Sequence, residues 1–377
     1  MSKFRVYSPE VECIHCGKKS SLIAESLKLC LDCVREKFDE VRPHIEEVHH
    51  RTRKEFDLPP SPPCHPEGIA CQLCANECRI PSGEKSYCGL RRNEGGKLVG
   101  VSEDKGNLDW YYDNLPTNCV ADWVCPGGSG AGYPAYSYSS GPEYGYKNLA
   151  VFFHGCSFNC LFCQNWHWRD NLIKRSYITP LQLAEAVDSR TACICYFGGD
   201  PAPQLLYALQ VSRLALEKNK DRVLRICWET NGAMSSSYLK KIADLSLKSG
   251  GCIKFDLKAW RESLHFTLCG VSNRRVLENF AILASWGKQR PDPPFLIAST
   301  LLVPGYVDED EVSSIAHFIA SLNPNIPYSL LAFYPQFYMH NLPTTSRSHA
   351  ERCKKIAEKE GLKKVRIGNL NLLSNAY

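Results

Sequence analysis

LAVFFHGCSFNCLFCQNWHWRD, residues 149–170, joins an apolar run to three closely spaced cysteines. The apolar run predicts a buried β-strand that leads directly into Cys156, Cys160 and Cys163. Three thiolates on one short loop can hold three irons of a 4Fe–4S cluster and leave the fourth iron without a protein ligand. A structural zinc loop is the alternative, but zinc normally takes four ligands, and the nearest fourth candidate is His167. The spacing therefore favours an iron–sulfur loop with one open iron.

The composition is that of a globular protein with many metal-ligating side chains. The chain has 377 residues, 44% of them hydrophobic, which suits one large α/β domain and a smaller module. No run of about 18 apolar residues occurs, so no membrane span is predicted. Twenty cysteines, several in CxxC pairs and without an export signal, favour metal binding in a reducing cytoplasm. The net charge of +5 is too small to indicate a nucleic-acid partner.

The first of three cysteine groups lies near the amino terminus. Cys13-x2-Cys16 and Cys30-x2-Cys33 have the spacing of a four-thiolate tetrahedral site, which suits zinc or a single rubredoxin-type iron. Basic and acidic residues balance across residues 1–60, whereas a ribbon that binds phosphates should be basic. We therefore expect a metal-binding module that is structural or contacts a protein.

A helix and a linker are predicted after this ribbon. Charged and apolar residues alternate at helical spacing over residues 34–56, and His44, His49 and His50 are expected to be solvated on that helix. The proline-rich residues 58–63 predict a stiff extended linker. These features divide the chain into three predicted segments: residues 1–58, the four-Cys ribbon and helix; residues 59–148, the linker, a second four-Cys site and a loop; and residues 149–377, an α/β barrel.

The second cysteine group comprises Cys71, Cys74, Cys78 and Cys88. Four thiolates suffice for a closed zinc or iron site or for an auxiliary cluster, and Cys64 could replace one of them.

Residues 127–146 are dense in Gly, Pro, Ser and Tyr and show neither helical nor strand periodicity. They predict a long loop on the surface or over a cofactor. Two interpretations stay open: a cross-over loop with aromatic packing, or a loop whose tyrosines, together with Cys119 and Cys125, line a pocket for the substrate or a second cofactor.

From residue 149 onward, strands alternate with helices, which predicts βα units around a parallel sheet. In such folds ligands bind at the carboxyl ends of the strands. The predicted helices include residues 203–217, 274–286 and 309–322. The predicted strands are residues 149–153, 192–197, 223–229, 252–256, 295–302 and 328–333.

The cysteine loop, C-x3-C-x-aromatic-C with Phe162 at the aromatic position, resembles that of the radical SAM superfamily. The resemblance implies a partial (βα)6 barrel whose open iron chelates the amino and carboxylate groups of S-adenosylmethionine. Strand-end motifs that resemble the superfamily's cofactor contacts are Gly198-Gly199-Asp200-Pro201, Glu229-Thr230-Asn231, Asp256 with Lys258, and Tyr334. Asp200 stands where relatives carry Glu, and Tyr334 where they usually carry His.

Further resemblances concern the branch of the superfamily. Residues 71–93 resemble the AmmeMemoRadiSam-type enzymes, and the D-L-K and V-P-G motifs resemble glycyl-radical-enzyme activases. A resemblance to the archaeal enzymes that C-methylate a glutamine of methyl-coenzyme M reductase implies a protein or peptide substrate, a ferredoxin or flavodoxin as electron donor, and cobalamin. No D-x-H-x-x-G cobalamin sequence is present. The alternatives are an activase that generates a glycyl radical on a partner, and a metal-ribbon binding module with an inactive barrel.

Overall fold

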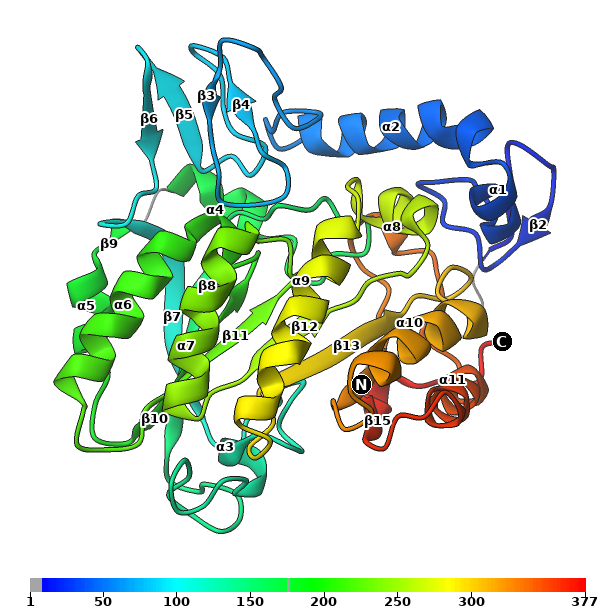
Figure 1. Cartoon of the computed structure of the whole chain (residues 1–377). Helices are drawn as coiled ribbons and strands as arrows, with labels where there is room; N and C mark the ends of the chain where they lie inside the picture. Colours follow the sequence, from blue (N-terminus) through cyan, green and yellow to red (C-terminus); the bar gives the residue numbers. More distant parts are fainter. Residues whose placement is uncertain (1–8, 175–176) are drawn as a thin grey trace.

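The computed structural model describes residues 9–174 and 177–377, so residues 1–8 of the predicted ribbon segment lie outside the described residues. Within this described part, a nine-stranded sheet curves around a central lumen, in the order β15-β14-β13-β12-β11-β10-β8-β7-β9 (Figure 1). Seven of its strands are parallel: β8 (Lys147–Phe153), β10 (Thr191–Gly198), β11 (Arg225–Thr230), β12 (Ile253–Asp256), β13 (Leu296–Leu302), β14 (Tyr328–Ala332) and β15 (Val365–Gly368).

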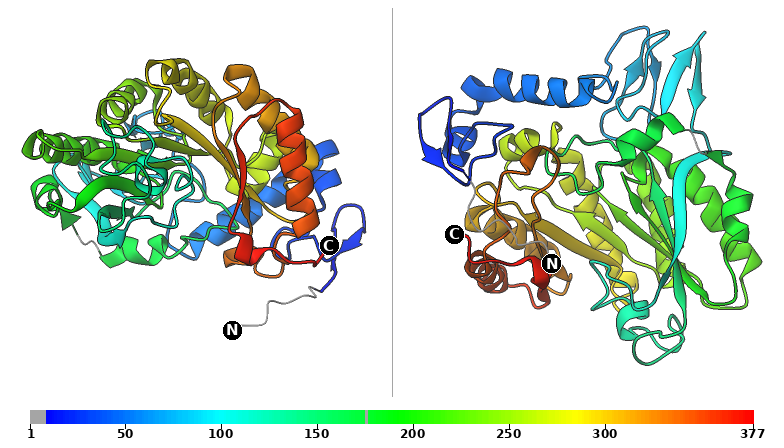
Figure 2. Two further views of the ribbon diagram at one scale, coloured as in Figure 1. Left: turned by 90° about the horizontal axis from the view of Figure 1, so that it is seen from below. Right: turned by 180° about the vertical axis from the view of Figure 1, so that it is seen from behind.

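Helices cover the outside of the sheet, as the view along the barrel in Figure 2 shows. Each presents an apolar stripe; in α7, for example, Leu239, Ile242, Ala243 and Ser246 are buried at spacings of three and four residues. The outer helices are α5 (Pro180–Glu185), α6 (Leu205–Lys218), α7 (Leu239–Ser249), α9 (Arg274–Trp286), α10 (Glu309–Leu322) and α11 (Arg347–Lys359). Shorter pieces are α4 (Trp168–Lys174), α8 (Glu262–Cys269), η1 (Ala202–Gln204), η2 (Ser236–Tyr238), η3 (Gly287–Gln289), η4 (Phe337–Met339) and η5 (Leu370–Leu372).

The predicted α/β barrel class is confirmed, and all six predicted strands occur with ends shifted by at most a few residues. Three strands of the sheet, β7, β9 and β15, were not predicted. β15 is short and follows two lysines, so it lacks an apolar run. β7 (Gly106–Asn114) pairs antiparallel with β8 and leaves much of its Trp-Tyr-Tyr run exposed. β9 (Tyr177–Ile178) pairs antiparallel with β7 at the edge of the sheet.

The amino-terminal segment forms a small ribbon and two helices that lie across the carboxyl ends of the barrel strands (Figure 1). Its elements are β1 (Val11–Glu12), β2 (Lys19–Ser20), α1 (Leu31–Glu36) and α2 (Phe38–Lys54). The single predicted helix is interrupted at Lys37, whose φ of −125° is not helical. The prediction that His49 is solvated is wrong: its ring is buried between α2 and the end of α8, where Nε2 lies 3.1 Å from the carbonyl oxygen of Thr267.

The segment between the linker and β8 contributes two features to the barrel. Small hairpins stand beside the strand ends: β3 (Ile69–Ala70) with β4 (Arg79–Ile80), and β5 (Arg91–Glu94) with β6 (Lys97–Gly100). Residues 115–146, with α3 (Pro126–Ser129), close the opposite end of the barrel, at the bottom of Figure 1. We call residues 115–146 the plug. The division of the chain at residues 58 and 148 stays a prediction.

Candidate active site

The cysteine loop follows β8 and is pressed against the loop that follows β10. Gly199 donates its N–H to the carbonyl of Phe153 (2.7 Å), and Asp200 donates to the carbonyl of Gly155 (3.1 Å). A Cβ on Gly199 would overlap the carbonyl oxygen of Gly155, so only glycine permits this approach. The two loops are therefore held together by backbone contacts at the carboxyl ends of neighbouring strands.

One cavity at the strand ends brings most of the sequence-predicted residues together. Pro201 and Tyr334, at the ends of β10 and β14, are not among its described lining residues, so their contact with a cofactor stays a prediction. The predicted residues that line the cavity are Cys156, Cys160, Cys163, Phe162, Gly198, Gly199, Asp200, Glu229, Thr230, Asn231, Asp256 and Lys258.

Asp200 is buried and ties the loop after β10 to the loop after β11. Its carboxylate accepts the backbone N–H of Asn231 and of Ala202, each at 2.7 Å, and the Thr230 hydroxyl at 3.1 Å. Burial raises the pKa of Asp200 to about 6, and these hydrogen bonds from Asn231, Ala202 and Thr230 oppose the rise. The carboxylate that replaces the Glu of relatives thus also positions the turn that carries Asn231.

Asn231 connects that turn to the cysteine loop. Its side-chain Nδ2 lies 3.7 Å from the Sγ of Cys156 and donates to the Ser157 hydroxyl at 3.0 Å. An amide donor aimed at a cysteine sulfur stabilises the thiolate form, which is the form that binds a metal.

Lys258 and Asp256 form a charged pair that lines the same cavity. The ammonium of Lys258 lies 2.7 Å from Asp256, whose carboxylate also accepts the Ser299 hydroxyl at 2.7 Å. Burial alone would lower the pKa of Lys258, but the charge of Asp256 outweighs it and holds this pKa above its usual value. The lysine therefore stays charged and can bind a carboxylate of a ligand.

Two arginines lie behind the cysteine loop with N–H groups that find no partner among the described residues. They are Arg169, unpartnered at Nε and Nη1, and Arg53, unpartnered at Nη1; both side chains are buried. Arg169 donates to Asn159 of the loop at 3.2 Å, and its charge lowers the pKa of Cys163 against the larger effect of burial. Buried cations with free donors are expected next to a group that carries negative charge and accepts hydrogen bonds.

The amino-terminal cysteines Cys13, Cys16, Cys30 and Cys33 form a compact site. Their four Sγ atoms lie within 4.8 Å of one another, with 3.8 Å between Cys13 and Cys33 and 3.7 Å between Cys16 and Cys30. Four bonds of about 2.3 Å arranged tetrahedrally place sulfurs about 3.8 Å apart. The predicted four-Cys site therefore has the dimensions of a single-metal site.

The ribbon that carries this site is docked on the rim of the barrel. The Tyr306 hydroxyl accepts the N–H of Ala24 at 2.9 Å and donates to the carbonyl of Leu29 at 3.0 Å. Arg35 forms a two-bond ion pair with Asp308 (2.7 and 2.5 Å). The ribbon is thus fixed next to the loop that follows β13.

The second cysteine group is less compact. Cys74, Cys78 and Cys88 are buried and Cys71 is half-buried, but among the described residues these four sulfurs do not all come within 4.8 Å of one another. Asn76 of this group's loop donates to the carbonyl of Ser157 at 2.7 Å, which fixes the loop against the cysteine loop of β8. Metal binding by this group stays a prediction.

Several residues of the cavity were not found from the sequence. Lys254 lies inside β12 and its ammonium contacts Glu229 at 2.6 Å; Asn165 donates to the carbonyl of Gly198 at 3.0 Å; Val120 reaches the cavity from the plug. A lysine inside a strand otherwise flanked by apolar residues is a signal that could have identified Lys254.

The geometry of three cysteines and three strand-end motifs around one cavity agrees with the comparison with protein families. Residues 150–319 match the family model described as the radical SAM superfamily. Residues 150–319 are therefore a radical SAM domain, as the sequence resemblance implied.

Similar curated proteins come from archaea and bacteria. An uncharacterized protein of Methanocaldococcus jannaschii is 25% identical over 80% of this chain and 81% of its own length. The isethionate sulfite-lyase activating enzyme of Desulfovibrio desulfuricans is 33% identical over 36% of this chain and 40% of its own length. The pyruvate formate-lyase 1-activating enzyme of Escherichia coli is 26% identical over 43% of this chain and 63% of its own length. The chain therefore spans less than two thirds of either activating enzyme.

Among solved structures, a radical SAM methyltransferase from Sphaerobacter thermophilus aligns with a TM-score of 0.44 and 15% identity, covering 60% of this chain and 68% of that one.

Across the described residues, none of the helices combines the length and apolar character needed to cross a membrane.

Proposed function

We propose that this chain reductively cleaves S-adenosylmethionine and uses the resulting radical to modify a residue of a protein or peptide. The observation that carries the proposal is the cavity in which the cysteine loop of β8 meets the strand-end motifs of β10, β11 and β12. These motifs are far apart in the sequence. A barrel with a purely structural role would not require them to meet at one cavity.

The residues present fit the cofactors that the superfamily implies. Cys156, Cys160 and Cys163 would hold three irons of a 4Fe–4S cluster, and the unpartnered N–H groups of Arg169 and Arg53 supply donors behind their loop. When bound, the cluster supplies an electron that splits S-adenosylmethionine into methionine and a 5′-deoxyadenosyl radical.

The chain's own side chains position the cofactor and substrate. Lys258 offers a half-buried ammonium for the methionine carboxylate, and Thr230 and Asn231 offer hydrogen bonds to the ribose hydroxyls. Apolar Phe162 and Phe158 line the same cavity and exclude water from it. The plug, which closes the far end of the lumen, leaves the strand-end side as the approach for a substrate.

The reductive step has a direct test. Full-length protein reconstituted anaerobically with iron and sulfide, then given S-adenosylmethionine and dithionite, should produce methionine and 5′-deoxyadenosine in equal amounts. Cys156→Ala should abolish both products. Absence of cleavage in iron-loaded wild type would leave an inactive barrel with metal-binding modules as the better description. Retention of cleavage in Cys156→Ala would contradict the assignment of the reductive step to the cysteine loop.

For the modification itself we propose C-methylation of a protein residue, with a glutamine of methyl-coenzyme M reductase as the candidate target and cobalamin as methyl carrier. The resemblance of the chain to the archaeal enzymes that C-methylate a glutamine of methyl-coenzyme M reductase supports this choice. Transfer of a labelled methyl group from S-adenosylmethionine to a target peptide would support it, together with a corrinoid spectrum and stoichiometric cobalt. If cobalt is absent and no label is transferred, the methylation proposal fails.

A second candidate is the activation of a glycyl-radical enzyme. The two similar enzymes of D. desulfuricans and E. coli are named as activating enzymes, which favours this alternative. A stable protein-centred radical on a partner enzyme, detected by EPR after turnover without methyl transfer, would identify it. In either case a reduced ferredoxin or flavodoxin is the proposed electron donor.

A further inference from the structure

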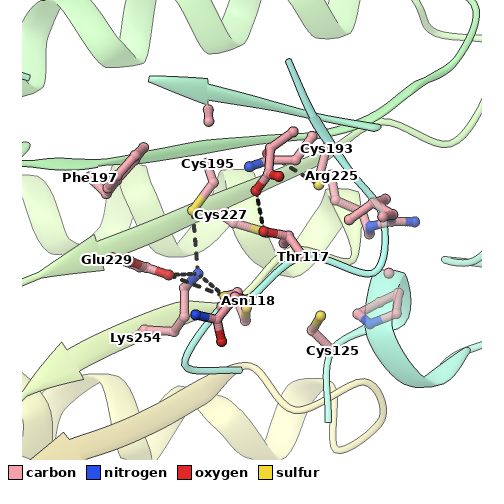
Figure 3. A pocket seen from close by; sticks show the side chains of 18 of the residues that line it. Thr117, Asn118, Cys125, Cys193, Cys195, Phe197, Arg225, Cys227, Glu229 and Lys254 are labelled. Carbon is pink, nitrogen blue, oxygen red and sulfur yellow. Dashed lines mark hydrogen bonds and ion pairs between the residues drawn. The ribbon is translucent and has the colours of Figure 1, made fainter. Parts of the chain in front are cut away.

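Six cysteines line a second cavity inside the barrel, between the proposed active site and the plug. Cys193 and Cys195 come from β10, Cys227 from β11 and Cys252 from the residue before β12, whereas Cys119 and Cys125 come from the plug. We call these six residues the lumenal cysteines. Figure 3 shows the side chains of Cys125, Cys193, Cys195 and Cys227 around this cavity.

Strand periodicity places these thiols in the lumen. In β10, Ala192, Ile194 and Tyr196 are fully buried on the face that the helices cover, and the two cysteines between them point to the other face. Bulky branched side chains usually fill the interior of such barrels. Here short thiols leave a cavity of about 110 Å³ instead.

The register of the sheet sets the spacing of the thiols. Cys195 pairs with Cys227 across β10 and β11, and Cys252 lies beside Cys227, because Trp228 pairs with Ile253. Neighbouring strands lie about 4.8 Å apart, so Cys195 and Cys252 are separated by about 9.6 Å of backbone; Cys193 lies about 6.6 Å along β10 from Cys195.

This spacing is too wide for a single tetrahedral ion. Such an ion requires sulfurs about 3.8 Å apart. Of the residues that the structure describes, only the amino-terminal four-Cys site gathers three or more ligand atoms within 4.8 Å of one another. An iron–sulfur cluster suits a wider set, because irons and sulfides lie between its ligands.

Charged groups around the cavity suit a negatively charged occupant. The ammonium of Lys254 lies 3.0 Å from the Sγ of Cys119, 3.3 Å from that of Cys195 and 2.6 Å from Glu229, and Figure 3 draws its contacts with Cys195 and Glu229. The guanidinium of Arg225, fixed by Glu143 at 2.8 and 2.5 Å, lies in the same wall. Cysteines that serve only as small apolar residues need no such cations beside them.

We propose that the lumenal cysteines hold a second iron–sulfur cluster, with Cys125, Cys193, Cys227 and Cys252 as its ligands. Cys119 and Cys195 are assigned to the surroundings, because Lys254 already contacts their sulfurs. With four thiolate ligands, this cluster has no open iron and carries electrons instead of binding S-adenosylmethionine. Phe197, Glu229 and Lys254 line both cavities, so the cluster lies in the same lumen as the proposed radical chemistry.

The test uses the full chain in a Cys156→Ala/Cys160→Ala/Cys163→Ala background, which removes the other lumen-facing loop of thiols. After anaerobic reconstitution with iron and sulfide, acid-labile sulfide per chain is measured and the iron is examined by Mössbauer spectroscopy. Adding Cys193→Ala/Cys227→Ala should remove about four sulfides per chain. Adding Cys353→Ala, which removes a buried cysteine of α11, should remove none.

A separate variant tests the second cysteine group, because this group could also hold sulfide. Cys71→Ala/Cys88→Ala in the same background should leave the lumenal sulfide in place. The proposal is overturned if Cys193→Ala/Cys227→Ala leaves the sulfide content unchanged. It is equally overturned if the background protein contains zinc without sulfide.

A conservative variant covers the case in which the double variant does not fold. Cys227→Ser keeps the volume of the side chain and should alter the Mössbauer isomer shift of one iron site, whereas Cys195→Ser should not alter any. If both serine variants retain the spectrum of the background protein, the cavity holds no cluster and the proposal is overturned. This assignment does not depend on the proposed substrate, because every readout is metal content or spectrum.

Discussion

At the scale of single residues, the proposed active site depends on positively charged side chains that lie close to the sulfurs of the cysteine loop. Arg169 and Arg53 are removed from solvent, and Lys258 is half-buried; a charge in such a place is costly unless it has a partner. Their positions next to the cysteine loop are explained if each faces an anionic group of the cofactors. Three cysteines alone indicate a metal site. The surrounding cations indicate that the bound groups carry negative charge.

Replacing Lys258 by methionine should weaken binding of S-adenosylmethionine to the reconstituted protein by roughly 10- to 100-fold. A hydrogen bond to a charged group contributes about 1.5–3 kcal/mol, and methionine keeps the length of the side chain without the charge. Equilibrium dialysis with labelled S-adenosylmethionine measures the effect. Lys248→Met, on the exposed face of α7, should bind as wild type does. Equal affinity in both variants would remove Lys258 from the cofactor site.

Arg169→Gln should make the midpoint potential of the proposed cluster more negative by roughly 60–120 mV. The loss of a buried cation disfavours the more negative reduced state, and for one electron 59 mV corresponds to a tenfold change in equilibrium. An EPR-monitored redox titration gives the potential. Arg169→Lys should recover part of the shift, and Arg347→Gln on the exposed side of α11 should show none. An unchanged potential in Arg169→Gln would mean that this guanidinium does not face the cluster.

At the scale of elements, the plug and α2 are attached to the barrel by buried polar contacts. Arg225 of β11 pairs with Glu143 of the plug, and both side chains are almost completely inaccessible. On the opposite side, Asn159 of the cysteine loop donates to His49 at 2.9 Å and to Thr52 at 3.0 Å, both on α2. The plug and α2, which lie outside the (βα) repeats, are therefore fixed to the barrel at the two ends of its lumen.

Glu143→Gln should lower the free energy of unfolding by about 3–5 kcal/mol, because it leaves the Arg225 guanidinium buried without its counter-charge. Urea denaturation followed by tryptophan fluorescence measures this change. The matched control is Glu358→Gln, which breaks an exposed pair with Lys354 and should cost no more than about 0.5 kcal/mol. Similar small costs in both variants would contradict the structural role of the Glu143 pair.

Acid should destabilise the docked α2 between pH 6.5 and 4. Burial lowers the pKa of His49 to about 4, and burial likewise lowers that of His265 to about 4. The unfolded chain therefore binds more protons than the folded one in this window, and the free energy of unfolding falls as pH falls, by up to about 1.4 kcal/mol per pH unit for each histidine.

Denaturation at pH 7 and pH 5 checks this dependence. His49→Gln should reduce the slope, and His317→Gln, at an exposed position on α10, should not. A slope that is the same in wild type and His49→Gln would contradict the assignment.

At the scale of the whole molecule, the ribbon that carries the amino-terminal four-Cys site is docked on the rim of the barrel. The ribbon, the rim loop after β13 and α2 form one continuous contact above the cavity. A change in the ribbon is therefore expected to reach the proposed active site through α2.

Cys16→Ser should remove about one metal ion per chain and make α2 accessible to protease, because a four-thiolate site contributes its binding energy directly to folding of its module. Metal analysis and limited proteolysis measure the two effects together. His15→Ala changes an exposed residue between the same cysteines and should retain both the metal and the protection. Loss of metal without exposure of α2 would show that the ribbon docks independently of its metal.

The sequence was sufficient for the features that are encoded locally. The cysteine loop, the four-Cys spacing and the parallel-strand repeats follow from residue spacing and periodicity, and the fold class and the radical SAM domain were confirmed. β7 and β15 were not predicted, because β7 is exposed along much of its length and β15 has only four residues. Each is a strand because it pairs with a neighbouring strand, and its sequence pattern alone does not indicate one.

Only the tertiary structure shows where the remaining polar groups gather. The burial of His49, the use of Asp200 to hold the turn at Asn231, and the position of Lys254 depend on contacts between residues at least 25 positions apart. The lumenal cysteines illustrate the limit most clearly: Cys119 and Cys252 are separated by 133 residues, and no spacing links them. Strand register and the closure of the lumen by the plug bring them together, because curvature of the sheet turns one face of every strand towards a common centre.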